Sequence, residues 1–70
     1  MQNMIPVSSS NIRSVGYEPE TQRLYIQFRT ALYVYSGVPE SVYIGLMNAP
    51  SHGTYHAKYI KYCYPYQRVG

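Results

Sequence analysis

Residues 23–39 read RLYIQFRTALYVYSGVP and decide the fold of this chain. Leu24, Ile26 and Phe28 alternate with polar or amphipathic residues, which is the period-2 pattern of a β-strand with one apolar face. A second alternating run, over residues 32–35, begins after a connection short enough for a hairpin. The stretch closes with Ser-Gly-Val-Pro, which interrupts extended structure. It therefore predicts a β-hairpin that leads into a different kind of element.

The residues after the hairpin have helical spacing. Pro39 followed by an acidic residue is typical of the first turn of a helix, and the apolar residues within 39–48 recur on one helical face. Gly45 is unfavourable inside such a helix, and we expect it to mark close packing against the sheet. Ser51 is a good N-cap for a second helix, which we expect to run to about Tyr62.

The residues before and after these elements complete a small sheet. A short strand is predicted over residues 12–17. Residues 18–21 should form a turn, because proline and acidic residues do not continue a central strand. Residues 1–10 are expected to be a loose lead-in, and residues 63–68 to be either an edge strand or an ordered tail.

Together these elements predict an α+β fold. It consists of a three-stranded antiparallel β-meander followed by two short helices packed on one face of the sheet. We expect residues 1–70 to form one small domain with an ordered core of about residues 7–68. A chain of this length lies near the lower limit for folding without disulfides or metals.

The core of so small a domain must use tyrosine. The chain holds ten Tyr, one Phe and no Trp, and leucine occurs only at positions 24, 32 and 46; several tyrosine rings should therefore be buried.

The lone Cys63 excludes an internal disulfide, suits a reducing compartment, and is expected to be a small buried hydrophobe. The N-terminus lacks the pattern of a signal peptide, and no apolar run approaches the ~20 residues of a membrane span. We expect a cytoplasmic protein with no membrane partner.

The net charge of +3 is unevenly distributed, because three arginines and three glutamates cancel in residues 1–40 whereas residues 41–70 carry three cations and no acid. The sequence therefore assigns the positive field to the C-terminal third, where cations are interleaved with tyrosines. Cations contact phosphates and flat rings stack on bases, so this segment is the candidate RNA-binding site. Its candidate residues are Lys58, Lys61, Tyr62, Tyr64, Tyr66 and Arg68. The alternative is a solvated helix face followed by a tail that packs on the sheet.

A set of short motifs occurs in order over roughly residues 5–69. The motifs are Val7-x-Ser9, Gly16-Tyr17, Leu24-x-Ile26-x-Phe28, Tyr33-x-Tyr35, Val38-Pro39, Ala49-x-Ser51-x-Gly53, Tyr55, Ile60 and Tyr64-Pro65-Tyr66. In this set the chain resembles the KTSC domain, a short module found alone in bacterial and phage proteins and at the C-terminus of some lysyl-tRNA synthetases. Where family members have Phe-Asn after the matching tyrosine, this chain has His56-Ala57. The resemblance implies a binding module, and its attachment to a synthetase suggests RNA as the ligand.

The resemblance also singles out five residues that we expect to be structural: Tyr33, Tyr35, Ser51, Gly53 and Tyr55. Two interpretations of the tyrosine pair stay open. Tyr33 and Tyr35 could stack two bases on the sheet surface, as aromatic residues do in sheet-based RNA-binding modules. Alternatively, both rings face the helices and join the core. The second interpretation is favoured because the intervening position is often polar in the resembled family, which points the tyrosines inward.

The remaining polar residues do not indicate catalysis. His52 and His56 have the i, i+4 spacing of a metal-binding pair, but no acid or cysteine nearby supplies a third ligand. Cys63 lies ~10 Å along a helix from His56, too far for a nucleophile–base pair. Two of the three glutamates flank a turn proline, and no glycine-rich phosphate loop is present. We therefore expect no catalytic residues, no metal site and no cofactor.

The sequence favours a small, non-catalytic binding module. Candidate partners are RNA or a nucleotide, another protein, or a second copy of the chain, because an exposed sheet edge in so small a domain favours association. A first alternative is a phage or mobile-element accessory protein that binds a host protein or a small nucleotide ligand. A second alternative is a structural protein–protein interaction domain.

Overall fold

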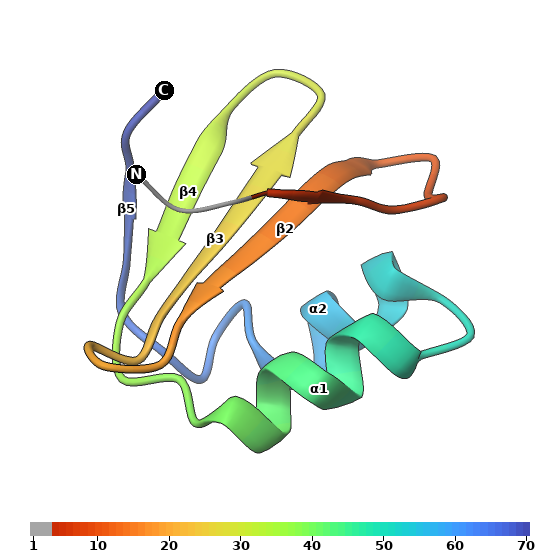
Figure 1. Cartoon of the computed structure of the whole chain (residues 1–70). Helices are drawn as coiled ribbons and strands as arrows, with labels where there is room; N and C mark the ends of the chain where they lie inside the picture. Colours follow the sequence, from red (N-terminus) through yellow and green to blue (C-terminus); the bar gives the residue numbers. More distant parts are fainter. Residues whose placement is uncertain (1–3) are drawn as a thin grey trace.

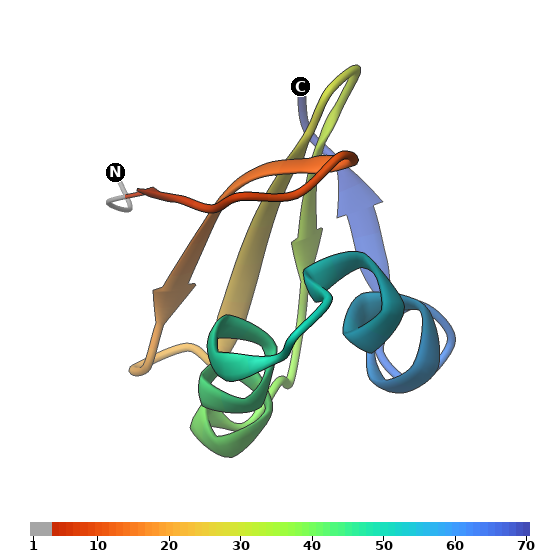
Figure 2. The same cartoon turned by 90° about the vertical axis from the view of Figure 1, so that its right-hand side faces the viewer.

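The computed structural model describes residues 4–70. Five strands form one antiparallel sheet in the order β1-β2-β3-β4-β5, and both helices lie on one side of it (Figures 1 and 2). The elements are β1 Ile5–Pro6, β2 Ile12–Glu18, β3 Arg23–Phe28, β4 Leu32–Tyr35, α1 Glu40–Asn48, α2 His52–Tyr59 and β5 Tyr66–Arg68. The α+β class and the central meander are confirmed. The predicted strand count was wrong, because one further strand lies at each edge of the sheet.

Strand β3 forms the centre of the core. Leu24 and Ile26 are fully buried, and β3 pairs with β2 on one side and β4 on the other. Leu24 lies opposite both Tyr17 and Tyr35, so the central apolar residue is flanked by tyrosines on the same face. Helix α1 covers this face with Leu46, which is also fully buried.

Tyr17 shows how a buried tyrosine fixes the position of a helix. Its hydroxyl donates a hydrogen bond to the carbonyl oxygen of Val38, just before α1, over 2.6 Å. Its ring stacks on that of Tyr43 in α1, with ring centroids 5.0 Å apart. Burial raises the pKa of Tyr17, and the nearby charge of Glu40 raises it further. The expectation that several tyrosines are structural is thus confirmed.

The second helix begins where the sequence predicts, and the first begins at Glu40, one residue later than predicted. Pro39 is the N-cap of α1, and the Ser51 hydroxyl caps α2 by accepting a hydrogen bond from the backbone N–H of Thr54 over 3.3 Å. Within residues 4–70, no helix is both long enough and apolar enough to cross a bilayer.

The second helix ends earlier than predicted. It stops at Tyr59 rather than about Tyr62, and residues 60–63 form a turn. Ile60 is fully buried in the core, and its φ of −120° departs from helical geometry at the point where the chain changes direction. Cys63 follows in this turn and is exposed, so the expectation of a buried thiol was wrong.

The two edge strands are very short, so β1 escaped prediction and β5 was expected only as one of two alternatives. Strand β1 has two residues and pairs with β2, with Ile5 opposite Val15. Strand β5 pairs with β4, which resolves the choice for the C-terminal segment in favour of an edge strand. Segments of two or three residues contain too few positions to show an alternation. Residues 1–3 of the expected lead-in lie outside the described residues.

Gly45 permits close packing, although between the helices rather than against the sheet. A Cβ atom at this position would lie 2.8 Å from the Cζ atom of Tyr55 in α2 and still closer to its hydroxyl oxygen. The ring of Tyr55 is in turn held against that of Tyr59, with centroids 4.7 Å apart. The expected contact of Gly45 with the sheet was therefore wrong.

This contact predicts opposite effects for the same substitution at two helical glycines. Gly45→Ala should lower the free energy of unfolding by about 1–2 kcal/mol, because overpacking against Tyr55 outweighs the gain in helix propensity. Gly53→Ala should leave it unchanged or raise it by up to about 1 kcal/mol, because a Cβ there meets no atom within 4 Å. Urea denaturation measures both, and equal effects at the two positions would contradict the packing argument.

Candidate binding groove between the sheet and helix α2

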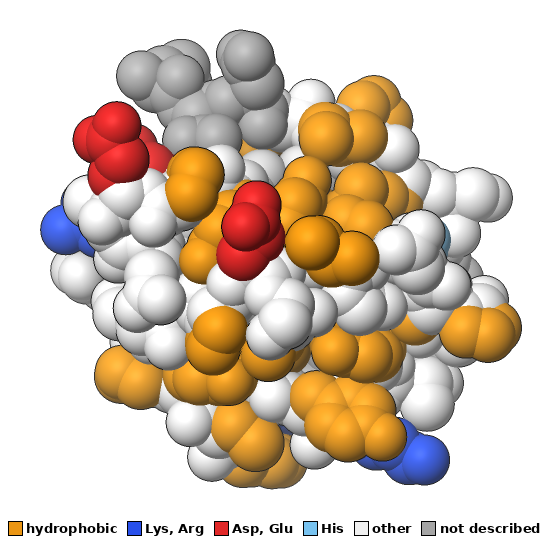
Figure 3. Space-filling view, turned by 60° about the horizontal axis from the view of Figure 1, so that its bottom comes forward, with side chains coloured by type: hydrophobic (Ala, Val, Ile, Leu, Met, Phe, Trp, Pro, Cys, Tyr) orange, Lys and Arg blue, Asp and Glu red, His pale blue; other side chains and the backbone are white. Residues whose placement is uncertain are grey.

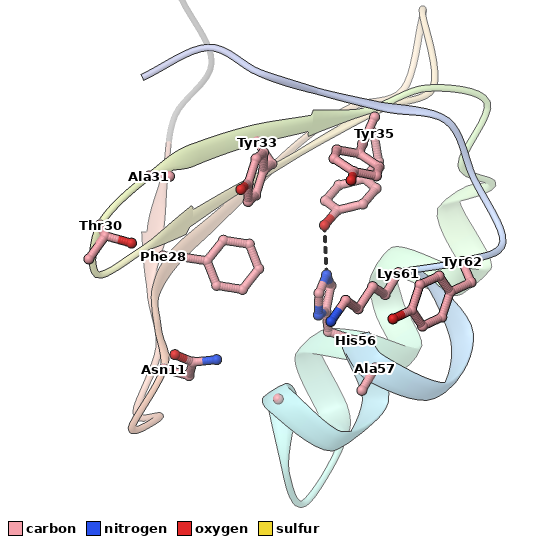
Figure 4. Close-up of a pocket in the computed structure, with 12 residues that line it drawn as sticks. Asn11, Phe28, Thr30, Ala31, Tyr33, Tyr35, His56, Ala57, Lys61 and Tyr62 are labelled. Atoms are coloured by element: carbon pink, nitrogen blue, oxygen red, sulfur yellow. Dashed lines mark hydrogen bonds between the residues drawn. The ribbon is translucent and has the colours of Figure 1, made fainter.

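A groove with a volume of about 420 Å³ lies between helix α2 and the helix-facing side of strands β3, β4 and β5 (Figure 4). Its volume falls in the range of sites that hold small molecules or single nucleotides. Asn11 and Thr30 lie at one end, and Lys61 and Tyr62 lie at the opposite end on the α2 side (Figure 4). The sheet side is aromatic.

The aromatic side follows from strand register. Tyr33 and Tyr35 alternate on β4 and so share one face, and β5 places Tyr66 directly opposite Tyr35. The rings of Tyr33 and Tyr66 meet edge to face with centroids 5.5 Å apart, as do those of Phe28 and Tyr33. Tyr66 is 59% exposed, whereas Tyr35 is only 2% exposed. The rings thus continue from the core to an open surface.

The tyrosine pair therefore combines the two interpretations drawn from the sequence. Both rings lie on the helix-facing side of the sheet, as the favoured interpretation predicted. Tyr35 belongs to the core, whereas Tyr33 is half-buried, packs against the core and also lines the groove.

A buried hydrogen bond joins the sheet to α2 beside the groove. The hydroxyl oxygen of Tyr35 lies 2.7 Å from Nε2 of His56. Burial lowers the pKa of His56, and the charge of Lys61 lowers it further. Burial also raises the pKa of Tyr35 to about 12, assisted by Tyr33 and Tyr66. Both partners are therefore neutral near pH 7.

The proton positions in this pair follow from the available acceptors. The Tyr35 hydroxyl has no second hydrogen-bond partner among residues 4–70, and we therefore assign it as the donor to Nε2. Neutral His56 then carries its own proton on Nδ1. Nδ1 has no partner within the described part of the chain, and no unpartnered side-chain atom there is fully buried. Nδ1–H is thus a solvent-reached donor beside the aromatic side of the groove.

The early end of α2 supplies the cation of the groove. Lys61 and Tyr62 lie in the turn after the helix, and both are exposed. The Lys61 ammonium group lies 5.3 Å from the centre of the Tyr62 ring, a cation–π distance. Lys61 lines the groove together with His56, whose pKa its charge lowers.

The structure divides the six candidates from the C-terminal segment. Lys61, Tyr62 and Tyr66 line the groove. Tyr64 is half-buried and packs against the core. Arg68 lies opposite Tyr33 on the groove face, with its Nη2 atom 3.5 Å from the carbonyl oxygen of Thr30.

Lys58 lies apart from the groove. It lines a smaller hollow of about 220 Å³ together with Tyr55 and Tyr59, both of which lie on α2. Of the motif residues from the sequence, Ser51 caps α2, Gly53 lines the main groove and Tyr55 packs beneath Gly45.

His56 and Phe28 are two aromatic groove residues that the sequence did not point to as ligand contacts. The i, i+4 histidine spacing suggested only a metal pair, yet the two rings have separate partners: Nδ1 of His52 donates to the carbonyl oxygen of Leu46 over 2.8 Å. The sequence showed that Phe28 belongs to the apolar face of the first hairpin strand. Its contact with Tyr33 depends on the register between β3 and β4, which the sequence did not provide.

The fold and the motif order together define a known class of small α+β domain. The family model of the KTSC domain matches residues 8–64, and the chain belongs to the KTSC domain family. It is similar to the crystal structure of a KTSC domain protein from Yersinia pestis, with a TM-score of 0.97, 39% identity and coverage of 100% of both chains.

Two further relatives differ greatly in length. An uncharacterized protein of Stutzerimonas stutzeri (strain A1501) is 40% identical over 58 residues, which cover 81% of this chain and 82% of that protein. A lysine–tRNA ligase of Nostoc sp. (strain PCC 7120) is 37% identical over 67 residues. These cover 94% of this chain but only 12% of the ligase.

The Tyr35–His56 hydrogen bond should stabilise the fold. Tyr35→Phe removes the hydroxyl and leaves Nε2 of His56 buried without a partner, which should cost about 1–3 kcal/mol in the free energy of unfolding. Tyr33→Phe is the matched control, because its hydroxyl has no hydrogen bond within residues 4–70, and it should change stability by less than about 0.5 kcal/mol. Urea denaturation of both variants measures the difference. Equal losses would show that the bond contributes nothing specific.

The same pair predicts a pH dependence of stability. Since the pKa of His56 is lower in the folded state than its ordinary value of 6.5, the unfolded chain binds more protons as the pH falls below that value. The free energy of unfolding should therefore decrease from about pH 6.5 towards pH 5, above the range where glutamates titrate. His56→Gln should remove this decrease, whereas His52→Gln should retain it. Parallel pH profiles for all three proteins would contradict the assignment.

Proposed function

We propose that this chain is a non-catalytic module that binds single-stranded RNA and holds one unpaired base in the groove between the sheet and α2. The observation that carries the proposal is the groove itself, which places exposed aromatic rings, a ring N–H donor and a lysine around a space of about 420 Å³. Sequence-specific RNA recognition commonly uses unpaired bases that stack on aromatic side chains.

The aromatic side supplies the stacking surface. Tyr66 is more than half exposed, and its ring is braced by Tyr33 and Tyr35. A braced ring loses little side-chain entropy when a base stacks on it. Stacking of one base on an aromatic side chain contributes ~1–3 kcal/mol.

The polar atoms supply contacts of two further kinds. The Nδ1–H group of His56 can donate to a carbonyl oxygen on the edge of a base. The Lys61 ammonium group, at the end of the groove, can contact a backbone phosphate. A neutral His56 and a charged Lys61 thus have separate roles, one for the base and the other for the backbone.

The absence of catalysis is part of the proposal. Burial moves the pKa of Tyr35 upward, opposite to the shift that an activated nucleophile needs. Among residues 4–70, no carboxylate side chain lines the groove, and neither does Cys63. His56 faces Tyr35 and aromatic rings rather than a group that it could activate.

The Nostoc relative adds an association. It is a lysine–tRNA ligase, so a stretch similar to nearly the whole of this chain occurs within an enzyme that acts on an RNA. The association supports RNA over an unrelated ligand of similar size.

The proposal predicts two separable effects on binding to a labelled oligouridylate of about ten nucleotides, followed by fluorescence anisotropy over a range of salt concentrations. Tyr66→Ala should weaken binding by ~1–3 kcal/mol and leave the salt slope nearly unchanged, because it removes stacking. Lys61→Gln should lower the salt slope by about 0.7, because it removes one phosphate contact.

The hollow on the other side of α2 provides matched controls. Tyr59→Ala removes a ring that is 53% exposed, and Lys58→Gln removes one cation from the same helix. Tyr59→Ala should leave both the affinity for RNA and the salt slope unchanged. Lys58→Gln should alter them only by the effect of one lost positive charge. Failure of the parent chain to bind the oligonucleotide at low salt would overturn the proposal, as would equal effects for Tyr66 and Tyr59.

A further inference from the structure

The fold separates charges that cancel along the sequence. Strand β2 pairs with β3 so that Ile12 lies opposite Phe28, and Glu18 lies opposite Arg23. Arg13 and Arg29, which adjoin the first pair, therefore lie at one end of this hairpin, and the glutamates of its turn lie at the other. On the face formed by α1 and the turn ends of the strands, acidic side chains are prominent and Lys and Arg side chains appear only at the margins (Figure 3).

The two arginines line a hollow of about 340 Å³ together with Ser9 and Ser10. The Arg29 Nη1 atom donates to the carbonyl oxygen of Ser10 over 3.4 Å, which leaves its other N–H groups available. Neither guanidinium group forms an ion pair with any residue among 4–70. Two unpaired guanidinium groups with forked donors suit an anion such as a phosphate.

The loop that borders this hollow is held by its own hydrogen bonds. The Ser9 hydroxyl accepts from the backbone N–H of Asn11 over 3.3 Å and from that of Ile12 over 3.4 Å. Val7 and the fully buried Ile12 complete the lining, so the hollow adjoins the hydrophobic core. An anion bound there would meet a surface already shaped by the fold.

The hollow adjoins one end of the groove. Asn11 and Thr30 line the groove, and their chain neighbours Ser10 and Arg29 line the hollow. Asn11 and Thr30 lie at the end of the groove away from Lys61 (Figure 4). Cationic side chains thus lie beyond both ends of the aromatic surface.

We propose that Arg13 and Arg29 form a phosphate-binding site that takes the backbone phosphate of a nucleotide adjoining the base held in the groove. The role in an RNA strand rests on the proposed function, whereas the ability to bind a phosphate rests only on the hollow. The strand then crosses the aromatic surface with one phosphate near Lys61 and another between the two arginines. Bidentate contacts from arginine position such a phosphate as well as attract it.

The test compares three single variants of equal charge. Arg13→Gln and Arg29→Gln should each lower the salt slope of oligouridylate binding by about 0.7, because each removes a phosphate contact. Arg23→Gln, at the opposite end of the same hairpin, should leave the slope at the parent value. If the parent binds the oligonucleotide and all three variants share one slope, the phosphate site is refuted while the groove proposal stands. Arg13→Gln removes no hydrogen bond within the described residues, so it remains informative if Arg29→Gln loosens the loop.

A second measurement separates the site from the RNA. Inorganic phosphate is titrated into the ¹⁵N-labelled parent chain, and backbone amide shifts are followed by NMR. Shifts centred on residues 9–13 and 29, absent in the Arg13→Gln and Arg29→Gln variants but retained in Arg23→Gln, support the anion site even if the parent binds no oligouridylate. If no RNA binds and phosphate shifts no amide in this region, both proposals fail.

Discussion

The hydrogen bond between Tyr35 and His56 is the constraint on which the placement of α2 depends. It joins β4 to the second helix at a depth where an unpaired hydroxyl or ring nitrogen would carry a desolvation cost. Phe28 meets the same imidazole edge to face, with centroids 5.1 Å apart. Tyr17 acts similarly for the other helix through the carbonyl of Val38. A core poor in leucine thus gains directional contacts, because each buried phenol needs a specific partner.

This arrangement also explains why a groove remains beside α2. The helix ends at Tyr59 because Ile60 enters the core, and the chain then turns. Lys61 and Tyr62 are carried to the side of the aromatic surface, whereas Lys58 stays on the helix and faces the smaller hollow. A helix that ran on to Tyr62 would have kept the two lysines on one face, because they are three residues apart. The burial of Ile60 therefore determines that Lys61, rather than Lys58, lines the groove.

The sequence predicted the features that extend over several residues. The alternation around Leu24 and Ile26 predicted the central strands, and the Ser51 cap predicted the start of α2. The sequence did not predict β1 and left β5 open between an edge strand and a tail, because their two or three residues form strands only by pairing with a neighbour. The exposure of Cys63 was missed for the same reason as the helix end, since both depend on the burial of Ile60. Three of the groove residues, Lys61, Tyr62 and Tyr66, were among the sequence candidates, whereas a role for His56 required the β4–α2 contact.

The charge pattern shows most clearly why position in the chain is a poor guide to position in space. In an antiparallel hairpin, distance from the turn decides which residues meet, so Arg13 and Arg29 lie at the open end of the β2–β3 hairpin, and Glu18 and Arg23 lie beside its turn. The sum of charges over residues 1–40 is zero because it combines both ends of the hairpin. The open end has an excess of positive charge, whereas the turn end has an excess of negative charge. The sequence assigned the positive field to the C-terminal third, but in the structure the field is not confined to that part of the chain. It continues around the groove because β5 brings Arg68 to within 3.5 Å of the Thr30 carbonyl oxygen, beside Arg29 in the chain. The register of the sheet, which the core tyrosines and Leu24 fix, thus also sets the direction in which a polyanion would be attracted.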